Sequence, residues 1–301
     1  MKQIVILSGK GGTGKTTVAA ALAHLFSQEG RVVLADADVD APNLEIILRP
    51  EPGEPQAFIG GELARIDAER CTGCNRCAEV CRFDAVNVAD GRYSVEPLSC
   101  EGCGACATQC PAGAIEMVDR RSGYWYRSAT RFGPFIHARL EPGEANSGKL
   151  VSQVRAASLE TAAETRADWI LVDGSPGIGC PVIAAITGMD LALLVAEPTL
   201  SGWHDLERAI AVARHFGTPC AVCINKADIN AGMTARIEAQ CRVSGIPVLA
   251  RLPYDETAVS AMRALRAVTE MPATPLTAAI EALYPSLKSS IEQPKRKGTA
   301  A

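Results

Sequence analysis

Eight of the twelve cysteines in this chain fall between positions 71 and 110, in two runs of one spacing, C-x2-C-x2-C-x3-C. The second run repeats the first at an offset of 29 residues. Thiolates this close together can ligate metals or form disulfides, and a 301-residue chain whose first residues do not read as a signal peptide favours metal ligation. Zinc sites usually pair two C-x-x-C units that lie far apart, whereas here three cysteines stand in register with a fourth. The spacing therefore favours iron–sulfur clusters over zinc and disulfides.

The second cysteine run ends in Cys110-Pro111, and the segment from Glu62 to Val118 closely resembles a two-cluster bacterial ferredoxin. The first run has Arg82 where proline is usual, a change that removes no ligand. The resemblance implies two [4Fe-4S] clusters, each using three cysteines of one run and the fourth of the other, and one-electron transfer at low potential. It assigns the first cluster to Cys71, Cys74, Cys77 and Cys110, and the second to Cys81, Cys100, Cys103 and Cys106.

A second motif lies near the N-terminus, where residues 8–17 read SGKGGTGKTT. It fits the phosphate-loop pattern G-x4-G-K-S/T and lies between a predicted strand and a predicted helix. Backbone N–H groups and the helix N-terminus of such a loop hold phosphates. Lys15 should bridge the β- and γ-oxygens, and Thr16 should give its hydroxyl to Mg²⁺. We expect a nucleotide to contact Gly9, Lys10, Gly11, Gly12, Thr13, Gly14, Lys15, Thr16 and Thr17.

The form K-G-G-x-G-K-T-T resembles the deviant Walker A loop of the MinD/ParA/nitrogenase-iron-protein class. That resemblance implies an ATPase in which Lys10 crosses a dimer interface, so that the positive charge around the nucleotide is completed only when two subunits close. The stretch DADVDAPNL resembles the switch I segment, and WILVD resembles the Walker B strand. We expect Asp38 to act on the attacking water, and Thr16, Asp36 and Asp173 to lie at Mg²⁺. The candidate catalytic residues are Lys10, Lys15 and Asp38.

A third group of candidates concerns the nucleotide base. Asn225 ends an apolar run and resembles the base-contacting asparagine of the same class. The sequence Asn225-Lys226-Ala227-Asp228 also matches the N-K-x-D pattern by which GTPases recognise guanine. The class resemblance favours ATP, but Asp228 leaves GTP open. We expect Asn225, Lys226, Asp228, Pro253 and Tyr254 to surround the base.

Alternating short apolar runs and helical patterns place these motifs on one α/β domain. Apolar runs at 3–7, 31–35, 169–173 and 191–199 predict buried strands, and 16–28, 151–167 and 205–217 predict helices. The expected fold is a P-loop NTPase parallel sheet flanked by helices, with an inserted α+β ferredoxin domain of bacterial type. The predicted divisions are an ATPase domain at 1–60 and 146–285, an insert at 61–120, a connector at 121–145 and a disordered tail at 286–301.

Composition argues against several classes of protein. The net charge of −4 and an aromatic content of 5% disfavour a nucleic-acid binder. No apolar run has the length needed to span a bilayer, and Pro285 interrupts the last helical pattern, which argues against a membrane-targeting helix. The chain is therefore expected to be cytoplasmic.

The chain as a whole is similar to MinD-superfamily ATPases that carry an inserted ferredoxin domain. This resemblance implies a homodimer, or a heterodimer with a paralogue, that forms on ATP binding. The first hypothesis is a Mg-ATPase whose nucleotide state is coupled to electron transfer toward a redox or metalloprotein partner. The second is a MinD/ParA-like positioning or assembly ATPase with structural or redox-sensing clusters. The third is an iron–sulfur cluster carrier.

Overall fold

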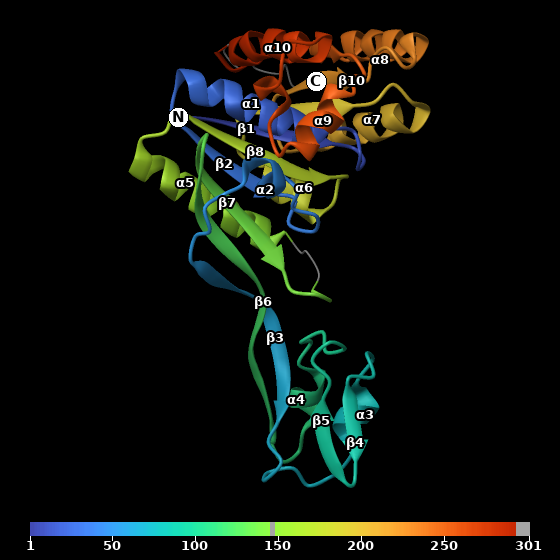
Figure 1. Cartoon of the computed structure of the whole chain (residues 1–301). Helices are drawn as coiled ribbons and strands as arrows, with labels where there is room; N and C mark the ends of the chain where they lie inside the picture. The colour runs from blue at the N-terminus through green and yellow to red at the C-terminus, as the bar shows by residue number, and fades with distance from the viewer. Residues whose placement is uncertain (145–147, 293–301) are drawn as a thin grey trace. The chain divides into compact units, whose positions relative to one another are not determined.

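The computed structural model describes residues 1–144 and 148–292, which divide into two compact units (Figure 1). Unit 1 comprises residues 1–56, 125–139 and the described residues from 148 onward. Unit 2 comprises residues 57–124 and 140–144. None of the helices within these described ranges is both long and apolar enough to cross a bilayer.

The centre of unit 1 is a parallel sheet, part of a nine-stranded sheet with the order β11-β10-β9-β1-β8-β2-β7-β6-β3. The ladders from β11 to β7 are all parallel, and Val5 of β1 lies between Val172 of β8 and Ala192 of β9. Strands in the middle of this sheet are apolar along most of their length because helices cover both faces of the sheet. The strands of unit 1 are β1 (Lys2–Ser8), β2 (Val32–Ala37), β7 (Gly133–Leu140), β8 (Trp169–Pro176), β9 (Leu191–Ala196), β10 (Cys220–Asn225) and β11 (Val248–Leu252).

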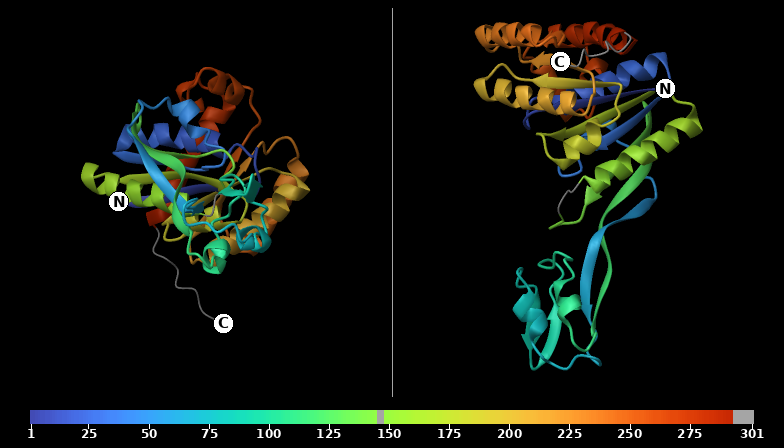
Figure 2. Two further views of the ribbon diagram at one scale, coloured as in Figure 1. Left: turned by 90° about the horizontal axis from the view of Figure 1, so that it is seen from below. Right: turned by 180° about the vertical axis from the view of Figure 1, so that it is seen from behind.

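Helices cover both faces of this sheet (Figure 2). One face packs against α1 (Lys15–Glu29), α2 (Leu44–Leu48) and α10 (Pro275–Glu292), with α9 (Thr257–Arg263) and the 3-10 turn η1 (Val268–Glu270) beside them. The remaining helices are α5 (Lys149–Thr165), α6 (Cys180–Ile186), α7 (Leu200–His215) and α8 (Ala231–Val243), and they contact β2, β8, β9 and β11 respectively.

Small side chains let α1 lie close to the strands. Its buried residues include the run Val18–Ala23, and Phe26 closes the layer. The Phe26 ring packs on Trp169 and Tyr284, with ring centroids 4.8 Å apart in both pairs. Burying a large apolar side chain such as Phe26 contributes about 1.5–3 kcal/mol. The helix that follows the phosphate loop is therefore fixed by the core, and the loop itself has a rigid base.

Unit 2 repeats one small motif. It contains β3 (Pro55–Ile66), α3 (Arg76–Val80), β4 (Val86–Ala89), β5 (Arg92–Val95), α4 (Ala105–Gln109) and the first part of β6 (Ile115–Thr130). Each short helix follows a left-handed residue, Asn75 in one half and Gly104 in the other. The two C-cap cysteines then adopt nearly the same backbone angles, and each accepts a backbone N–H on its sulfur, at 3.4 Å for Cys81 and 3.3 Å for Cys110. The internal repeat of the sequence is therefore a structural repeat.

Two predicted divisions of the chain need correction. The segment 121–145 is not a connector, because it holds the end of β6 and the whole of β7, which pairs with β2 in the main sheet. The tail predicted at 286–301 begins too early, since α10 continues through Pro285 to Glu292. Lys288 in this last turn pairs with Glu29 of α1 at 2.6 Å, and Leu287 is fully buried. The rest of the predicted tail, 293–301, lies outside the described residues.

Candidate nucleotide site and cysteine-lined hollows

The phosphate loop between β1 and α1 is held in shape by a side chain from another strand. Gly14 has a φ of 87°, a left-handed angle that favours glycine. Asn225, at the end of β10, donates from Nδ2 to Thr13 O at 2.8 Å. A Cβ on Gly14 would lie 2.3 Å from that Nδ2. The predicted base contact Asn225 thus also anchors the loop.

Lys15 is the central cation of the site. Its Nζ donates to Asp173 Oδ1 at 2.7 Å and lies 3.4 Å from Asp38 Oδ2. Burial disfavours the charged ammonium, but the neighbouring carboxylates outweigh burial and raise the pKa of Lys15. The structure therefore brings together three predicted site residues, Lys15, Asp38 and Asp173, from three separate parts of the sequence.

Asp36 has a second role that the sequence did not indicate. One of its oxygens accepts the backbone N–H of Asp38 at 3.0 Å, and the other accepts that of Leu44 at 3.1 Å. Burial, reinforced by the carboxylate of Asp173, raises the pKa of Asp36 well above its usual range. Asp36 thus braces the segment between β2 and α2. The magnesium role of Asp36 stays a prediction.

Two buried atoms in this region carry no hydrogen bond among the described residues, Asp173 Oδ2 and Thr13 Oγ1. Buried polar atoms are nearly always satisfied, so such exceptions point to a missing partner. A carboxylate oxygen suits Mg²⁺ or a water bound to it, and a hydroxyl suits a phosphate oxygen. Thr16 follows Lys15 in the first turn of α1 and is half-buried. The unpartnered Asp173 Oδ2 therefore fits the magnesium predicted there, and the role of Thr16 stays a prediction.

Glu197 is a residue of this site that no sequence motif indicated. It follows β9, which pairs with β1, so it lies beside the phosphate loop. Its two carboxylate oxygens bind two lysines, with Lys10 Nζ at 3.2 Å from Oε2 and Lys226 Nζ on Oε1. Although burial would raise the pKa of Glu197, the hydrogen bonds from Lys226 and Lys10 lower it. An acid directly after a buried strand, at the edge that carries the loop, was the available signal.

The other residues predicted at the base lie on two adjacent loops. Asp228 accepts the backbone N–H of Tyr254 on Oδ1 at 2.7 Å. This bond ties the loop after β10 to the loop after β11, which carries Pro253 and Tyr254. Tyr254 is exposed, with 52% of its surface accessible. One oxygen of Asp228 is therefore committed to backbone, which leaves less of the carboxylate for guanine.

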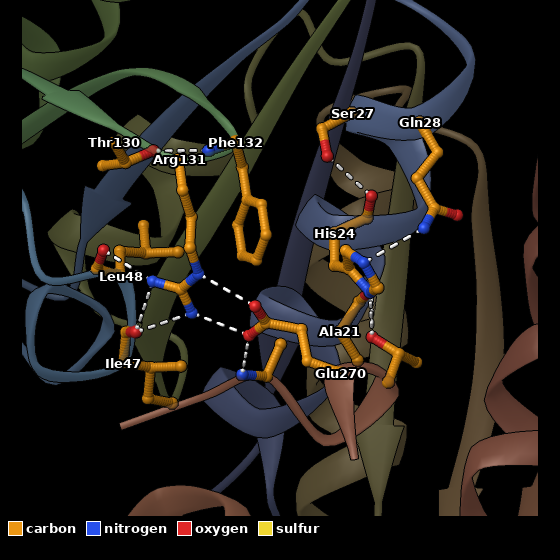
Figure 3. Close-up of polar contacts among 12 residues, drawn as sticks. Ala21, His24, Ser27, Gln28, Ile47, Leu48, Thr130, Arg131, Phe132 and Glu270 are labelled. Atoms are coloured by element: carbon orange, nitrogen blue, oxygen red, sulfur yellow. Dashed lines mark hydrogen bonds and ion pairs between the residues drawn. The ribbon is translucent and has the colours of Figure 1, made fainter. Parts of the chain in front are cut away.

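Helix α2, next in the chain after Asp36 and Asp38, is held at its carboxyl end by Arg131 (Figure 3). The Arg131 guanidinium donates to Ile47 O at 3.1 Å and to Leu48 O at 2.8 Å. It also forms a bidentate pair with Glu270, whose Oε2 accepts the Ala267 backbone N–H. Arg131 stands in the tight turn between β6 and β7. At the other end of α2, Glu45 pairs with Arg139 of β7 at 2.6 Å.

In unit 2 the eight cysteines of the two runs line two open hollows. The first is lined by Cys71, Cys74, Cys77 and Cys110, and the second by Cys81, Cys100, Cys103 and Cys106. Each hollow thus takes three cysteines from one run and the last cysteine of the other, the grouping that the ferredoxin resemblance implies, and cluster binding there stays a prediction. Within the described chain no three such side chains converge on a point suited to a single metal ion. Each thiolate of a cubane binds a different iron, so the four surround the cluster rather than converge on one ion.

Comparison with known proteins gives a consistent picture of the main domain. Residues 4–265 match the family model described as the CobQ/CobB/MinD/ParA nucleotide binding domain. The chain is 39% identical to the uncharacterized protein MJ0578 of Methanocaldococcus jannaschii over 76% of this chain and 79% of that protein. It is 46% identical to an iron-sulfur cluster carrier protein of the same organism, but over only 20% of this chain and 21% of that protein. The structure of MinD with Mg-ADP from Pyrococcus horikoshii OT3 covers 95% of both chains with a TM-score of 0.59 and 18% identity, a likeness of fold.

Proposed function

Because the chain belongs to the CobQ/CobB/MinD/ParA nucleotide-binding family, we propose that it is a dimeric Mg-ATPase whose nucleotide state is coupled to an iron–sulfur domain. In this proposal the domain exchanges electrons with a partner protein. The observation that carries the proposal is that one chain holds both a phosphate loop with a buried Lys15–Asp173 pair and two cysteine quartets around separate hollows.

Binding of ATP exchanges one set of partners of Lys15 for another. The ammonium is held by Asp38 and Asp173, and phosphate oxygens would compete for the same donors. Thr16 and Asp173 would hold Mg²⁺, which would supply neutralisation of phosphate charge. Asp38, once released from Lys15, is free to orient water. Lys10 of a second subunit adds positive charge where negative charge develops in the transition state.

The base is proposed to be adenine. Asn225 already donates Nδ2 to Thr13 O, and Asp228 already accepts from Tyr254. Guanine recognition would use both oxygens of one carboxylate, and the Tyr254 N–H already takes one acceptor position on Asp228 Oδ1. This arrangement favours ATP over GTP.

Each cysteine quartet is proposed to hold one [4Fe-4S] cluster, which supplies one-electron transfer when bound. The support is the sorting of the eight thiols into two hollows with the exchanged fourth cysteine. Burial raises the pKa of the Cys77 and Cys106 thiols, so metal binding must overcome the cost of forming thiolates there. The chain contributes the ligands and the backbone donors at Cys81 and Cys110, which are aimed at sulfur.

Coupling between the two activities is proposed to begin at Asp36 and Asp38. The segment that contains them leads into α2, and both ends of α2 are held by the β6–β7 turn and strand. β6 is one continuous strand that starts in the cysteine-bearing unit and ends in unit 1. A shift of Asp38 on nucleotide binding therefore reaches a strand shared by both units.

The test is to measure ATPase rate and nucleotide affinity anaerobically with the clusters oxidised, with the clusters reduced, and in a cluster-free cysteine variant. The expected result is a change of severalfold in rate between oxidised and reduced protein. Identical values in all three states would refute the coupling and leave the ATPase assignment intact. A control with Cys180→Ser, outside both quartets, should follow the wild type.

A second candidate, cluster carriage, is favoured by the short similarity to an iron-sulfur cluster carrier protein. It predicts rapid donation of iron and sulfur to an apo-ferredoxin, whereas four thiols around each hollow predict retention. The positioning hypothesis rests on the likeness of fold to MinD. It predicts nucleotide-dependent localisation in cells that Lys15→Ala abolishes.

A further inference from the structure

Lys10 is paired with an acid of its own chain. Its Nζ lies 3.2 Å from Glu197 Oε2, and only 32% of its side chain is accessible. The backbone of Lys10 is held as well, because Ser8 Oγ donates to Lys10 O at 2.8 Å. The lysine proposed to act on a second subunit is therefore bound within its own.

The acid that holds Lys10 is itself fixed by its surroundings. Thr199 N donates to Glu197 O at 2.8 Å, and Thr199 caps α7 by accepting from Gly202 N. A Cβ on Gly202 would lie 2.4 Å from Glu197 O, so the start of α7 packs directly on the Glu197 backbone. Glu197 is 14% accessible at its side chain. When Lys10 moves away, its carboxylate partner stays in place.

A second lysine lowers the energetic cost of releasing Lys10. Lys226 Nζ binds the other oxygen of Glu197, and Lys226 N donates to Asn225 Oδ1 at 3.0 Å. If Lys10 leaves, Glu197 and Lys226 remain as a neutral pair, and no buried charge is left alone. The Lys10–Glu197 ion pair can therefore break and form again, and we call this pair the latch.

We propose that Glu197 is a positioning residue that holds Lys10 against its own phosphate loop, in competition with a contact of Lys10 to a second copy of the chain. Lys10 leaves Glu197 when a second copy of the chain closes on the nucleotide. Glu197 therefore sets the nucleotide concentration at which two copies associate. This inference rests on the proposed function, in which Lys10 acts across a dimer.

The test compares Glu197→Gln with wild type. Sedimentation velocity measures the fraction of dimer as the concentration of a non-hydrolysable ATP analogue is raised in the presence of Mg²⁺. Glutamine keeps the shape and still accepts from Lys226, but it holds Lys10 less tightly. The dimerisation midpoint is expected to fall by about twofold to fivefold, the range for losing a partly exposed charge pair. Glu207→Gln, an exposed acid on α7, removes the same charge and should leave the midpoint unchanged.

A Lys10→Ala background separates the latch from general electrostatics. Glu197→Gln should have no effect on dimerisation there, because no lysine remains to be released. An equal shift in that background, or an unchanged or raised midpoint in the single variant, would overturn the inference. A melting curve without nucleotide checks that the variant is folded. If wild-type protein binds the analogue and stays monomeric, the dimeric function fails too, whereas a dimerising wild type with an unshifted variant refutes only the latch.

Discussion

Lys15 Nζ donates to Asp173 Oδ1 at 2.7 Å, a buried contact between residues 158 positions apart in the sequence. Asp38 lies on the other side of the same ammonium. Lys15 is thus the cation that neutralises a cluster of acids. The lysine predicted to bind phosphate therefore also pairs with the acids around it.

The first prediction concerns this pair. Lys15→Ala in nucleotide-free protein leaves Asp36, Asp38 and Asp173 together without a counter-charge, and it should lower the unfolding free energy by about 3–5 kcal/mol. Urea denaturation in EDTA measures the change. Lys15→Ala with Asp173→Ala should recover part of the loss, because the orphaned acid is gone. Lys10→Ala serves as control and should cost under about 1 kcal/mol. Equal stability of the two single lysine variants would contradict the prediction.

A glycine series tests the shape of the loop. Gly11 lies outside the left-handed region and has no atom within 4 Å of the place that an added methyl group would take, so Gly11→Ala should change stability by less than about 0.5 kcal/mol. Gly12 has open space but a φ of 80°, and Gly12→Ala should cost about 1–2 kcal/mol. Gly14 combines a φ of 87° with the contact to Asn225, so Gly14→Ala should cost most. Denaturation curves of the three variants should fall in that order, and a different order would mean that the loop has another conformation.

The exchanged cysteine arrangement makes a prediction about iron content. In Cys71→Ser with Cys110→Ser, both losses fall on one quartet, so about half of the iron should remain after anaerobic reconstitution. In Cys71→Ser with Cys81→Ser, the losses fall on both quartets and almost no iron should remain. Cys180→Ser should retain all of it. If the first pair lost all iron and the second kept half, each run would hold its own cluster.

Arg131 should contribute more to the stability of the fold than its partly exposed side chain suggests. Arg131→Ala removes the donors to Ile47 O and Leu48 O and leaves the half-buried Glu270 without its partner, which should cost about 1.5–3 kcal/mol. Arg131→Lys should recover only part, because an ammonium cannot span the carbonyls and the carboxylate together. Arg127→Ala is the matched control. Its side chain is also 33% accessible, but its partners Glu160 and Glu164 are exposed, so its loss should cost under about 1 kcal/mol. Thermal and urea unfolding give both values.

His137 predicts a pH dependence of stability. It stacks between Phe135 and Tyr126, and burial lowers its pKa, with Arg139 adding to the effect and Glu45 opposing it. A lowered folded-state pKa means that the unfolded chain binds the proton more tightly. The stabilisation is therefore complete above the unfolded pKa of about 6.5 and is lost as pH falls through the folded value. His137→Gln should flatten this slope between about pH 7 and 5, as urea denaturation across that range would show.

Much of the nucleotide site was predictable because its chemistry is local in the sequence. The loop and the start of its helix lie in one ten-residue stretch, Asp36 and Asp38 lie at the end of β2, and Asp173 of β8 pairs with Asp36 across the ladder. Parallel strands bring their carboxyl ends to one edge, so strand prediction alone placed these residues together. The grouping of the cysteines around two hollows was implied by the resemblance to a two-cluster ferredoxin, and cluster binding there stays a prediction.

The missed features depend on contacts between distant segments. Glu197 and Arg131 have no motif, and their partners are main-chain carbonyls or lysines from other elements. β7 was taken for a connector because a strand at this position needs its neighbour β2 to be recognised. The second role of Asp36 is to accept two backbone N–H groups. Backbone groups are present in every sequence, so they give no signal that would predict this role.

The pairing of β2 with β7 has a consequence for the order in which the chain assembles. Leu34 and Phe135 are partners across this ladder, although about a hundred positions separate them in the sequence. Closing so long a loop is entropically unfavourable and slows folding. The intervening unit carries its own small core of Ala64, Ala85 and Cys100, and β3 and β6 are neighbours in the sheet. Once β3 and β6 pair, the effective loop between β2 and β7 is short. Pairing within the cysteine-bearing segment therefore lowers the entropic cost of adding β7 to the sheet.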